Sequence, residues 1–310
     1  MCPVPAAVSV STSVVNGPLF TQQGFLTFDQ LQKTEVADVN SWIMSSVRRF
    51  QLHQPGKLQA VLYAPDEETW PTTFLLFAIG TALNAEAYST IFSAFASNRL
   101  AVVSIDISPG RMVKDSVERL VLSLEEVVHW LSDTIFGEDW RVASWIVGGH
   151  SAGGCAMFEF LADNKAASVL TQRAPIRGFI GFDPYNSSLS SKLKSLPLIE
   201  VLDQNSQVLL FGHTQKNNLI SPAEGALKFV SPRYFKYVKQ SNIHLHSFSE
   251  PHTHLSYVDD GVKVLGILPF WFSRLFLSFG FPKANQELRD LVVRKTLEIF
   301  ASLLLQAGVD

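Results

Sequence analysis

The stretch WIVGGHSAGG, residues 145–154, reads as an apolar strand that runs into a turn of small residues and then into a helix. It contains GHSAG at 149–153, which fits the pattern GxSxG. In a nucleophile elbow this pattern places a serine on a strained turn between a strand and a helix, where small neighbours let the backbone bend. We therefore interpret Ser151 as a catalytic nucleophile, with an ordinary structural turn as the alternative. The small-then-apolar run after Ser151 predicts a helix packed closely against a sheet.

Composition limits the classes of function. The 310 residues are 47% hydrophobic, so the chain can fill a sizeable core as one large domain or two small ones. The net charge is −3, so the chain lacks the excess of positive charge that is typical of nucleic-acid-binding proteins. Cys2 and Cys155 do not indicate a disulfide framework, and we interpret Cys155 as a small core residue. The first 20 residues lack the basic side chains of a signal or transit peptide, so the compartment stays open.

Apolar runs and helical spacings alternate along the chain. Residues 74–79 are continuously apolar, as expected of a strand buried on both faces of a parallel sheet. We predict a doubly wound, mostly parallel α/β sheet with helices on both faces, forming a single domain over residues 25–310. Residues 1–24 are an arm or an edge strand and stay unassigned. The predicted strands are 58–64, 74–79, 100–106, the strand before Ser151, 178–182, 207–212 and 243–248; the predicted helices are 85–96, 117–136, the one after Ser151, and 286–305.

A serine nucleophile needs a base, and the base needs an acid that fixes its tautomer. In the α/β-hydrolase fold these follow in the order Ser, Asp or Glu, His. Asp183 directly follows a predicted strand, and ligands bind at the carboxyl ends of such strands. Its structural alternative is an Asp-Pro turn. Asp203 is a weaker candidate because it precedes a strand.

Five histidines follow the predicted acid. His244 and His246 alternate with apolar residues, which favours a half-exposed strand face. His213 follows a strand and is a pocket candidate, but it comes too early for the usual last place in the order. His252 and His254 come right after the last predicted strand; we prefer His254 as the base and assign His252 to the pocket.

An ester hydrolase also needs two backbone N–H groups that stabilise the oxyanion. Ala152, directly after the nucleophile, supplies the first. We assign the second to Thr81, which follows Gly80 at the end of a predicted strand, with Ala82 as its neighbour. This chemistry needs neither a metal nor an organic cofactor, and we predict none.

At these residues the chain resembles the chlorophyllase family of α/β-hydrolases, which is related to platelet-activating-factor acetylhydrolase-like esterases. The resemblance runs from about Leu58 to the C-terminal helix. It implies the triad Ser151, Asp183 and His254, and the pair Asp259-Asp260 after His254 favours that histidine over His252. The motifs that carry it are residues 74–106, GHSAGG at 149–154, GFIGFDP at 178–184 and HLSYVDD at 254–260.

Two positions depart from the plant enzymes. Ala152 stands where plant chlorophyllases usually have Arg, and Ile79-Gly80 stands where they have His-Gly. The resemblance therefore implies an esterase without specifying chlorophyll. We expect a serine carboxylic-ester hydrolase of lipid metabolism that forms an acyl-enzyme. The alternatives are a lipase or esterase of another substrate class and a catalytically silent hydrolase fold used for binding.

The segment 264–281 bears on the substrate. It is rich in aromatic residues, among them Phe270 and Trp271, and is interrupted by Pro269 and Arg274, so a membrane span is not favoured. We interpret residues 262–285 as an apolar insertion or flap that lines the pocket, with ordinary core packing as the alternative. The partners expected are an ester with a bulky apolar group, phytyl-like or long acyl, and a lipid surface contacted through 264–281.

Overall fold

The described part of the chain forms one nine-stranded sheet, in the order β1-β2-β3-β5-β4-β6-β7-β8-β9. The computed structural model describes residues 13–15, 47–54, 58–66, 71–80, 83–106, 116–137, 140–185, 197–213, 225–248, 252, 254–259 and 282–306. The strands are β1 (Ser13–Val15), β2 (Val47–Gln54), β3 (Leu58–Pro65), β4 (Thr73–Ala78), β5 (Ala101–Asp106), β6 (Ser144–His150), β7 (Ile176–Phe182), β8 (Gln207–His213) and β9 (Ile243–Phe248). The helices are α2 (Ser89–Ser97), α3 (Ser116–Trp130), α4 (Ser151–Ala162), α5 (Asn164–Thr171), α6 (Ala226–Phe229) and α8 (Pro282–Gln306).

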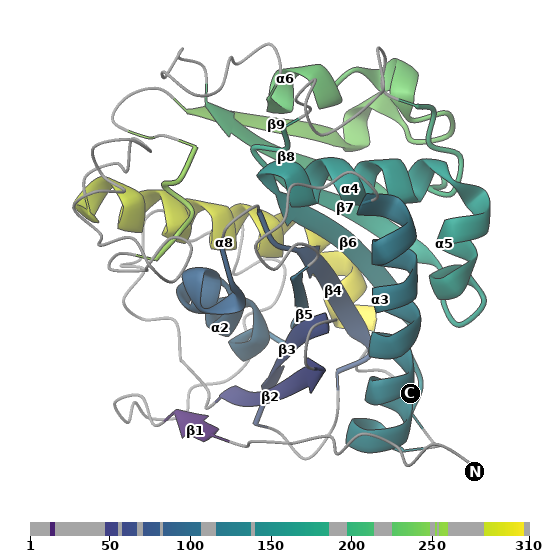
Figure 1. The fold of residues 1–310 in the computed structure, drawn as a ribbon. Helices are drawn as coiled ribbons and strands as arrows, with labels where there is room; N and C mark the ends of the chain where they lie inside the picture. Colours follow the sequence, from purple (N-terminus) through teal and green to yellow (C-terminus); the bar gives the residue numbers. More distant parts are fainter. Residues whose placement is uncertain are drawn as a thin grey trace.

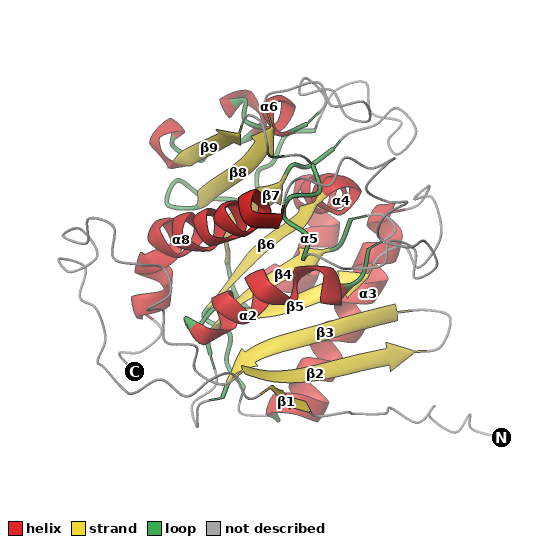
Figure 2. Cartoon of the chain, turned by 90° about the vertical axis from the view of Figure 1, so that its left-hand side faces the viewer, coloured by secondary structure: helices red, strands yellow, loops and turns green. Residues whose placement is uncertain are grey.

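The sheet is mostly parallel. Strands β5, β4, β6, β7, β8 and β9 are parallel to one another, while β1, β2 and β3 form an antiparallel edge in which β3 pairs antiparallel with β5. Helices α2 and α8 lie over one face, and α3 and α4 lie over the other (Figure 1). Figure 2 looks onto the face that carries α2 and α8. The protein is therefore an α/β protein with helices on both faces of its sheet.

The central strands are buried because both of their faces are covered. Every residue of β4 and β6 is buried. Alternate residues of β4 enter different cores: Leu76 packs with the cluster of α3 and α4, whereas Leu75 and Phe77 pack with the cluster of α2 and α8. This explains why the sequence of β4 is continuously apolar instead of alternating.

The strand register brings several strand ends into one row. Ala78 of β4 pairs with Gly149 of β6, which pairs with Gly181 of β7, which pairs with Leu210 of β8. The order in which strands are added to the sheet also reverses here: β5 lies on one side of β4, whereas β6 and then β7 lie on the other side. Parallel sheets bind ligands outside the carboxyl ends of their strands at such a switch point.

The predicted strands and long helices are present, with differences at several boundaries. β2 and α5 were not predicted. The helix predicted over 117–136 is α3 followed by a π-helical segment, Leu131–Phe136, that ends at Gly137 with φ 81°. Residues 13–15 of the unassigned N-terminal segment form an edge strand beside β2.

The predicted insertion 262–285 is described only in its last residues. Residues 282–285 form the first turn of α8, so this helix begins four residues earlier than expected. Segment 264–281, with Phe270 and Trp271, lies outside the described residues. Among the helices that are described, none is both long and apolar enough to cross a membrane.

Candidate active site

Ser151 occupies a sharp turn between β6 and α4. Its φ is 54°, a left-handed backbone conformation that residues other than glycine rarely adopt. Such a conformation costs about 1–3 kcal/mol. The neighbouring glycines let this turn approach β4. A Cβ atom on Gly153 would lie 2.3 Å from the carbonyl oxygen of Ala78, and one on Gly149 would lie 2.6 Å from the same oxygen. The glycines of the motif therefore permit the close packing that holds the turn.

Asp183 lies on a second left-handed turn, directly after β7, with φ 42°. Its main-chain N–H donates to the carbonyl of Phe211 at 2.7 Å, and the N–H of Tyr185 donates to the carbonyl of Ser151 at 3.0 Å. These hydrogen bonds join the turn after β7 to β8 and to the serine turn. The carboxyl group is buried, with the residue 1% exposed.

The Asp183 carboxyl accepts hydrogen bonds from two histidines. His254 donates from Nδ1 to Oδ2 at 2.7 Å, and His213 donates from its Nδ1 to the same oxygen. Burial opposes ionisation of Asp183, but the two histidine donors outweigh it and lower its pKa well below the usual range. The group is therefore a carboxylate. Because a carboxylate only accepts, each ring carries its hydrogen on Nδ1.

His213 is the last residue of β8 and is 5% exposed. We assigned it to the pocket from sequence, and the structure places it on the acid itself. Asp183, His213 and His254 are close enough together to hold a metal ion. Each offers one nitrogen or oxygen atom, and these three atoms lie within 4.8 Å of one another. The site is thus built around one buried carboxylate and two imidazoles.

The loop that carries His254 is fixed from two sides. Asp259 accepts hydrogen bonds from Ser89 Oγ at 2.8 Å and from the N–H of Thr90 at 2.9 Å, at the beginning of α2. Arg289 of α8 donates from Nη1 to the carbonyl of Val258 at 2.8 Å. The aspartate that distinguished His254 from His252 in the sequence therefore anchors the loop.

His252 does not contact Asp183. Its ring packs against Phe248, with 5.8 Å between ring centroids, and its buried Nδ1 has no hydrogen-bond partner among the described residues. Burial lowers the pKa of this imidazole, which favours the neutral ring. Of the two neighbouring histidines, the structure brings only His254 to Asp183.

His150, directly before the serine, connects three segments. Its Nε2 lies 2.9 Å from the carbonyl oxygen of His254, and its Nδ1 lies 2.7 Å from the hydroxyl of Tyr88. A carbonyl only accepts, so Nε2 carries the hydrogen. In the neutral ring Nδ1 then accepts from Tyr88.

Complete burial of His150 lowers its pKa to about 3, so this ring is neutral. Burial also raises the pKa of Tyr88 far above its ordinary value, which keeps its hydroxyl protonated. Sequence reasoning missed both roles. The motif places His150 beside Ser151, but no spacing rule connects it with Tyr88.

The end of β4 approaches the serine. A Cβ atom on Gly80 would lie 3.4 Å from the Cβ of Ser151 and 2.9 Å from Nδ1 of His150. Thr81 and Ala82, expected to supply the second oxyanion donor, lie outside the described residues. Ala152 is the second residue of α4, and N–H groups in a first helical turn have no acceptor within the helix.

The hydroxyl of Ser151 makes no hydrogen bond to His254 or to any other described residue. Such contacts are often long before substrate binds and tighten in the complex.

The remaining candidates lie elsewhere. Asp203 precedes β8, at the opposite end of the strand from His213, and forms an ion pair with Arg177. His244 and His246 are partly buried on β9, as expected of a strand face. Cys155 is buried, and burial raises the pKa of its thiol, consistent with a core residue.

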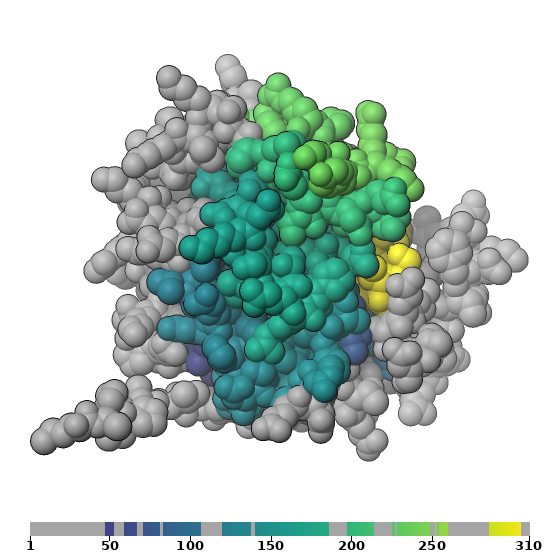
Figure 3. Space-filling view, turned by 90° about the vertical axis from the view of Figure 1, so that its right-hand side faces the viewer, coloured from purple at the N-terminus to yellow at the C-terminus, as the bar shows by residue number. Residues whose placement is uncertain are grey.

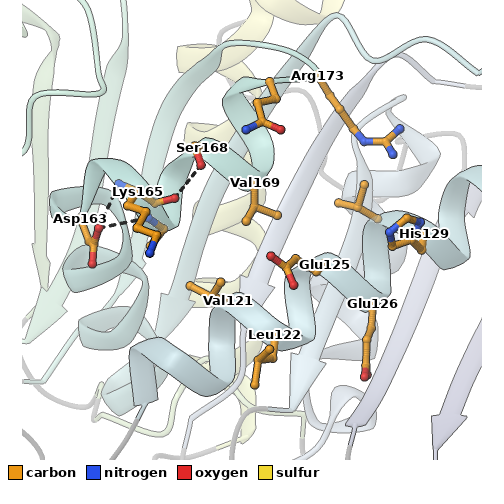
Figure 4. Close-up of a pocket in the computed structure, with 13 residues that line it drawn as sticks. Val121, Leu122, Glu125, Glu126, His129, Asp163, Lys165, Ser168, Val169 and Arg173 are labelled. Carbon is orange, nitrogen blue, oxygen red and sulfur yellow. Dashed lines mark hydrogen bonds between the residues drawn. The ribbon is translucent and has the colours of Figure 1, made fainter.

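A groove in the described residues lies away from this site, between α3 and α5. Its volume is about 840 Å³, and its lining includes Val121, Leu122 and Glu125 from α3 and Lys165 and Val169 from α5 (Figure 4). Figure 3 looks onto the side of the molecule where α3 and α5 lie, seen in teal. None of the predicted site residues lines this groove.

No protein-family model matches the chain, and no curated protein matches its sequence.

Proposed function

We propose that the protein is a serine carboxylic-ester hydrolase with the α/β-hydrolase fold, similar to the chlorophyllase family. The observation that carries the proposal is the 2.7 Å hydrogen bond from Nδ1 of His254 to the buried Asp183 carboxylate, at the same sheet edge as Ser151. The chain order of these residues is the order of the α/β-hydrolase triad. The left-handed turn at Ser151 supports the same proposal, because a nucleophile elbow is strained.

The proposed reaction begins with proton transfer from the Ser151 hydroxyl to Nε2 of His254 as the serine oxygen attacks the ester carbonyl. Asp183 holds His254 in the Nδ1–H tautomer, which leaves Nε2 free to accept, and stabilises the imidazolium that forms. The N–H groups of Ala152 and Thr81 stabilise the oxyanion.

The tetrahedral intermediate then collapses. The bond between the carbonyl carbon and the alcohol oxygen breaks, and the imidazolium returns its proton to the departing alcohol, leaving an acyl-serine. Water attacks this acyl group with His254 again as base. The carboxylic acid leaves, and Ser151 regains its proton.

For the substrate we propose an ester with a bulky apolar group, phytyl-like or long acyl. The support is compositional: residues 264–281 supply more aromatic side chains than a connecting loop needs. Each buried methylene contributes about 0.8 kcal/mol, so specificity constants should rise over several carbons of a p-nitrophenyl ester series. Trp271→Ala should flatten this rise. A flat series for the unmodified chain, or one that Trp271→Ala leaves unaltered, would refute the substrate class.

A fluorophosphonate probe tests the catalytic proposal directly. We expect a covalent adduct on Ser151, identified by mass spectrometry of the modified peptide, and no adduct in Ser151→Ala. Loss of the nucleophile should lower ester turnover by several orders of magnitude while the circular dichroism spectrum is retained. A folded protein that neither reacts with the probe nor hydrolyses esters would instead be a silent hydrolase fold used for binding.

A further inference from the structure

Two histidines on one carboxylate are more than a catalytic triad requires. One imidazole is enough to accept the serine proton, and His254 fills that role in the proposed function. His213 contributes a second ring to the same oxygen of Asp183. The three residues are 1%, 5% and 9% exposed for Asp183, His213 and His254. This extra ring changes what the cluster can bind.

We infer that Asp183, His213 and His254 form an inhibitory binding site for a divalent transition-metal ion such as Zn²⁺. The inference rests on the proposed function for its inhibitory effect but not for the binding itself. Two imidazole nitrogens and a carboxylate oxygen, all within 4.8 Å of one another, are the donor types that Zn²⁺ prefers. Oxygen-seeking Mg²⁺ does not favour such a set.

Asp183 provides a further observation that points to a cation. Its Oδ2 accepts from both rings, whereas its Oδ1 is buried and has no hydrogen-bond partner among the described residues. A buried carboxylate oxygen without a donor is unfavourable, and a bound cation would neutralise its charge. His254 is the most exposed of the three side chains, so an ion would enter from its side.

Metal binding would disable the base through its tautomer. A ring can ligate the ion through Nδ1 only when that nitrogen presents a lone pair, so a neutral ring must move its hydrogen to Nε2. His254 then carries its hydrogen on the nitrogen that must accept the proton of Ser151. No proton is lost from the neutral ring, yet general-base catalysis stops. The substrate does not compete for these ligands, so the ion should lower kcat and leave KM unchanged.

Isothermal titration calorimetry of the full chain with ZnCl₂ tests the site without any assay of activity. We expect one Zn²⁺ ion to bind at the buried site of each molecule, both in the unmodified chain and in Ser151→Ala. In His213→Gln the amide can still donate to Asp183 but supplies no imidazole nitrogen, so Zn²⁺ affinity should fall about a hundredfold. His246→Gln is the matched control, because His244 and His246 lie two residues apart on β9 and could bind Zn²⁺ at the surface.

Kinetics with a p-nitrophenyl ester tests the inhibitory effect. Zn²⁺ should lower kcat of the unmodified chain and of His246→Gln, EDTA should restore it, and Mg²⁺ should have no effect. The kcat of His213→Gln should be compared with the metal-free kcat of the same variant, and this ratio should stay near one at concentrations of Zn²⁺ that inhibit the unmodified chain. Equal inhibition of His213→Gln, or activation by Zn²⁺, would overturn the inference.

The two proposals fail separately. If Zn²⁺ binds with His213 dependence but no ester is cleaved and no fluorophosphonate adduct forms, the metal site stands and the esterase proposal falls. If the esterase is active and no His213-dependent binding occurs, the metal site falls. Should His213→Gln not fold, Co²⁺ added to the unmodified chain decides, because a four-coordinate nitrogen and oxygen site gives intense visible absorption. Absence of this absorption would overturn the inference.

Discussion

The imidazole of His150 donates from Nε2 to the main-chain carbonyl of His254 at 2.9 Å, so the residue before the proposed nucleophile holds the residue proposed as its base. The two rings also lie side by side, with 4.6 Å between their centroids. The position of His254 thus depends on the serine turn as well as on Asp183. Under the proposed function, this coupling makes His150 and Tyr88 positioning residues.

Removing the hydrogen bonds of the His150 side chain should lower kcat more than it raises KM. His150→Leu cannot donate to the His254 carbonyl, whereas His150→Gln keeps one donor and one acceptor. We expect kcat to fall about tenfold to a hundredfold in His150→Leu and substantial recovery in His150→Gln, since small misplacements of a base cost such factors. Equal losses in both variants would assign His150 a packing role alone.

Tyr88→Phe removes the donor to Nδ1 of His150 and leaves the ring stacked on Phe92. A buried acceptor without a donor costs about 1–3 kcal/mol, so the melting temperature should fall. We expect a moderate fall in kcat as well. The double variant Tyr88→Phe with His150→Leu should be no slower than His150→Leu alone, because both changes break one chain of hydrogen bonds. Independent, multiplying effects on kcat would contradict this prediction.

The neighbouring histidines should differ sharply in their effect on ester turnover. His254→Ala removes the ring that contacts Asp183 and should lower kcat by about 10⁴ or more, as for other triad members. His252→Ala should retain most activity, because that ring packs on Phe248 instead. The reverse ranking would move the base to His252.

Asp183→Asn should lower kcat by about 10⁴, because an amide can donate and so allows the wrong tautomer of His254. Asp203→Asn is the matched control, since Asp203 pairs with Arg177 and should leave kcat unchanged. An active Asp183→Asn chain would show that another carboxylate orients the base.

Acid should weaken the fold through His150. Its pKa is about 3 in the folded protein and near 6.5 when unfolded, so between these values the unfolded chain binds more protons. The free energy of unfolding therefore falls as pH drops below 6.5, by about 1.4 kcal/mol per pH unit from this group. His150→Gln should show a shallower slope in denaturant titrations between pH 7 and about 4. Parallel slopes for the two proteins would contradict burial of a neutral ring.

Much of the sheet could be predicted because its buried strands are apolar along their whole length, as in β4. β2 was missed: its first residues include Arg48 and Arg49, whose partly exposed side chains break the apolar pattern at this antiparallel edge. α5 was missed as well. Asp163 caps the N-terminus of this helix, and its side chain accepts hydrogen bonds from the N–H groups of Lys165 and Ala166. An aspartate before a short polar stretch is as typical of a loop as of a helix N-terminus, so the sequence did not identify this helix.

For the candidate site, the triad residues could be proposed because each follows a strand and they occur in a known order. The contacts around them could not be predicted. The link from Tyr88 to His150 spans 62 positions, and the sharing of Asp183 by His213 depends on the register of β7 with β8. Such relationships arise from three-dimensional packing, which local sequence patterns do not encode.

The anchoring of the base loop by Arg289 has a consequence for protein synthesis. Chains are made from the N-terminus and their parts fold as they emerge, so Ser151 leaves the ribosome long before α8 is complete. A nascent or prematurely terminated chain that ends before Arg289 would carry the serine and Asp183, but the carbonyl of Val258 would lack its α8 donor. Under the proposed function, full hydrolytic activity would then begin only once the last helix has docked, so incomplete chains would do little harm to the esters of the cell that makes them.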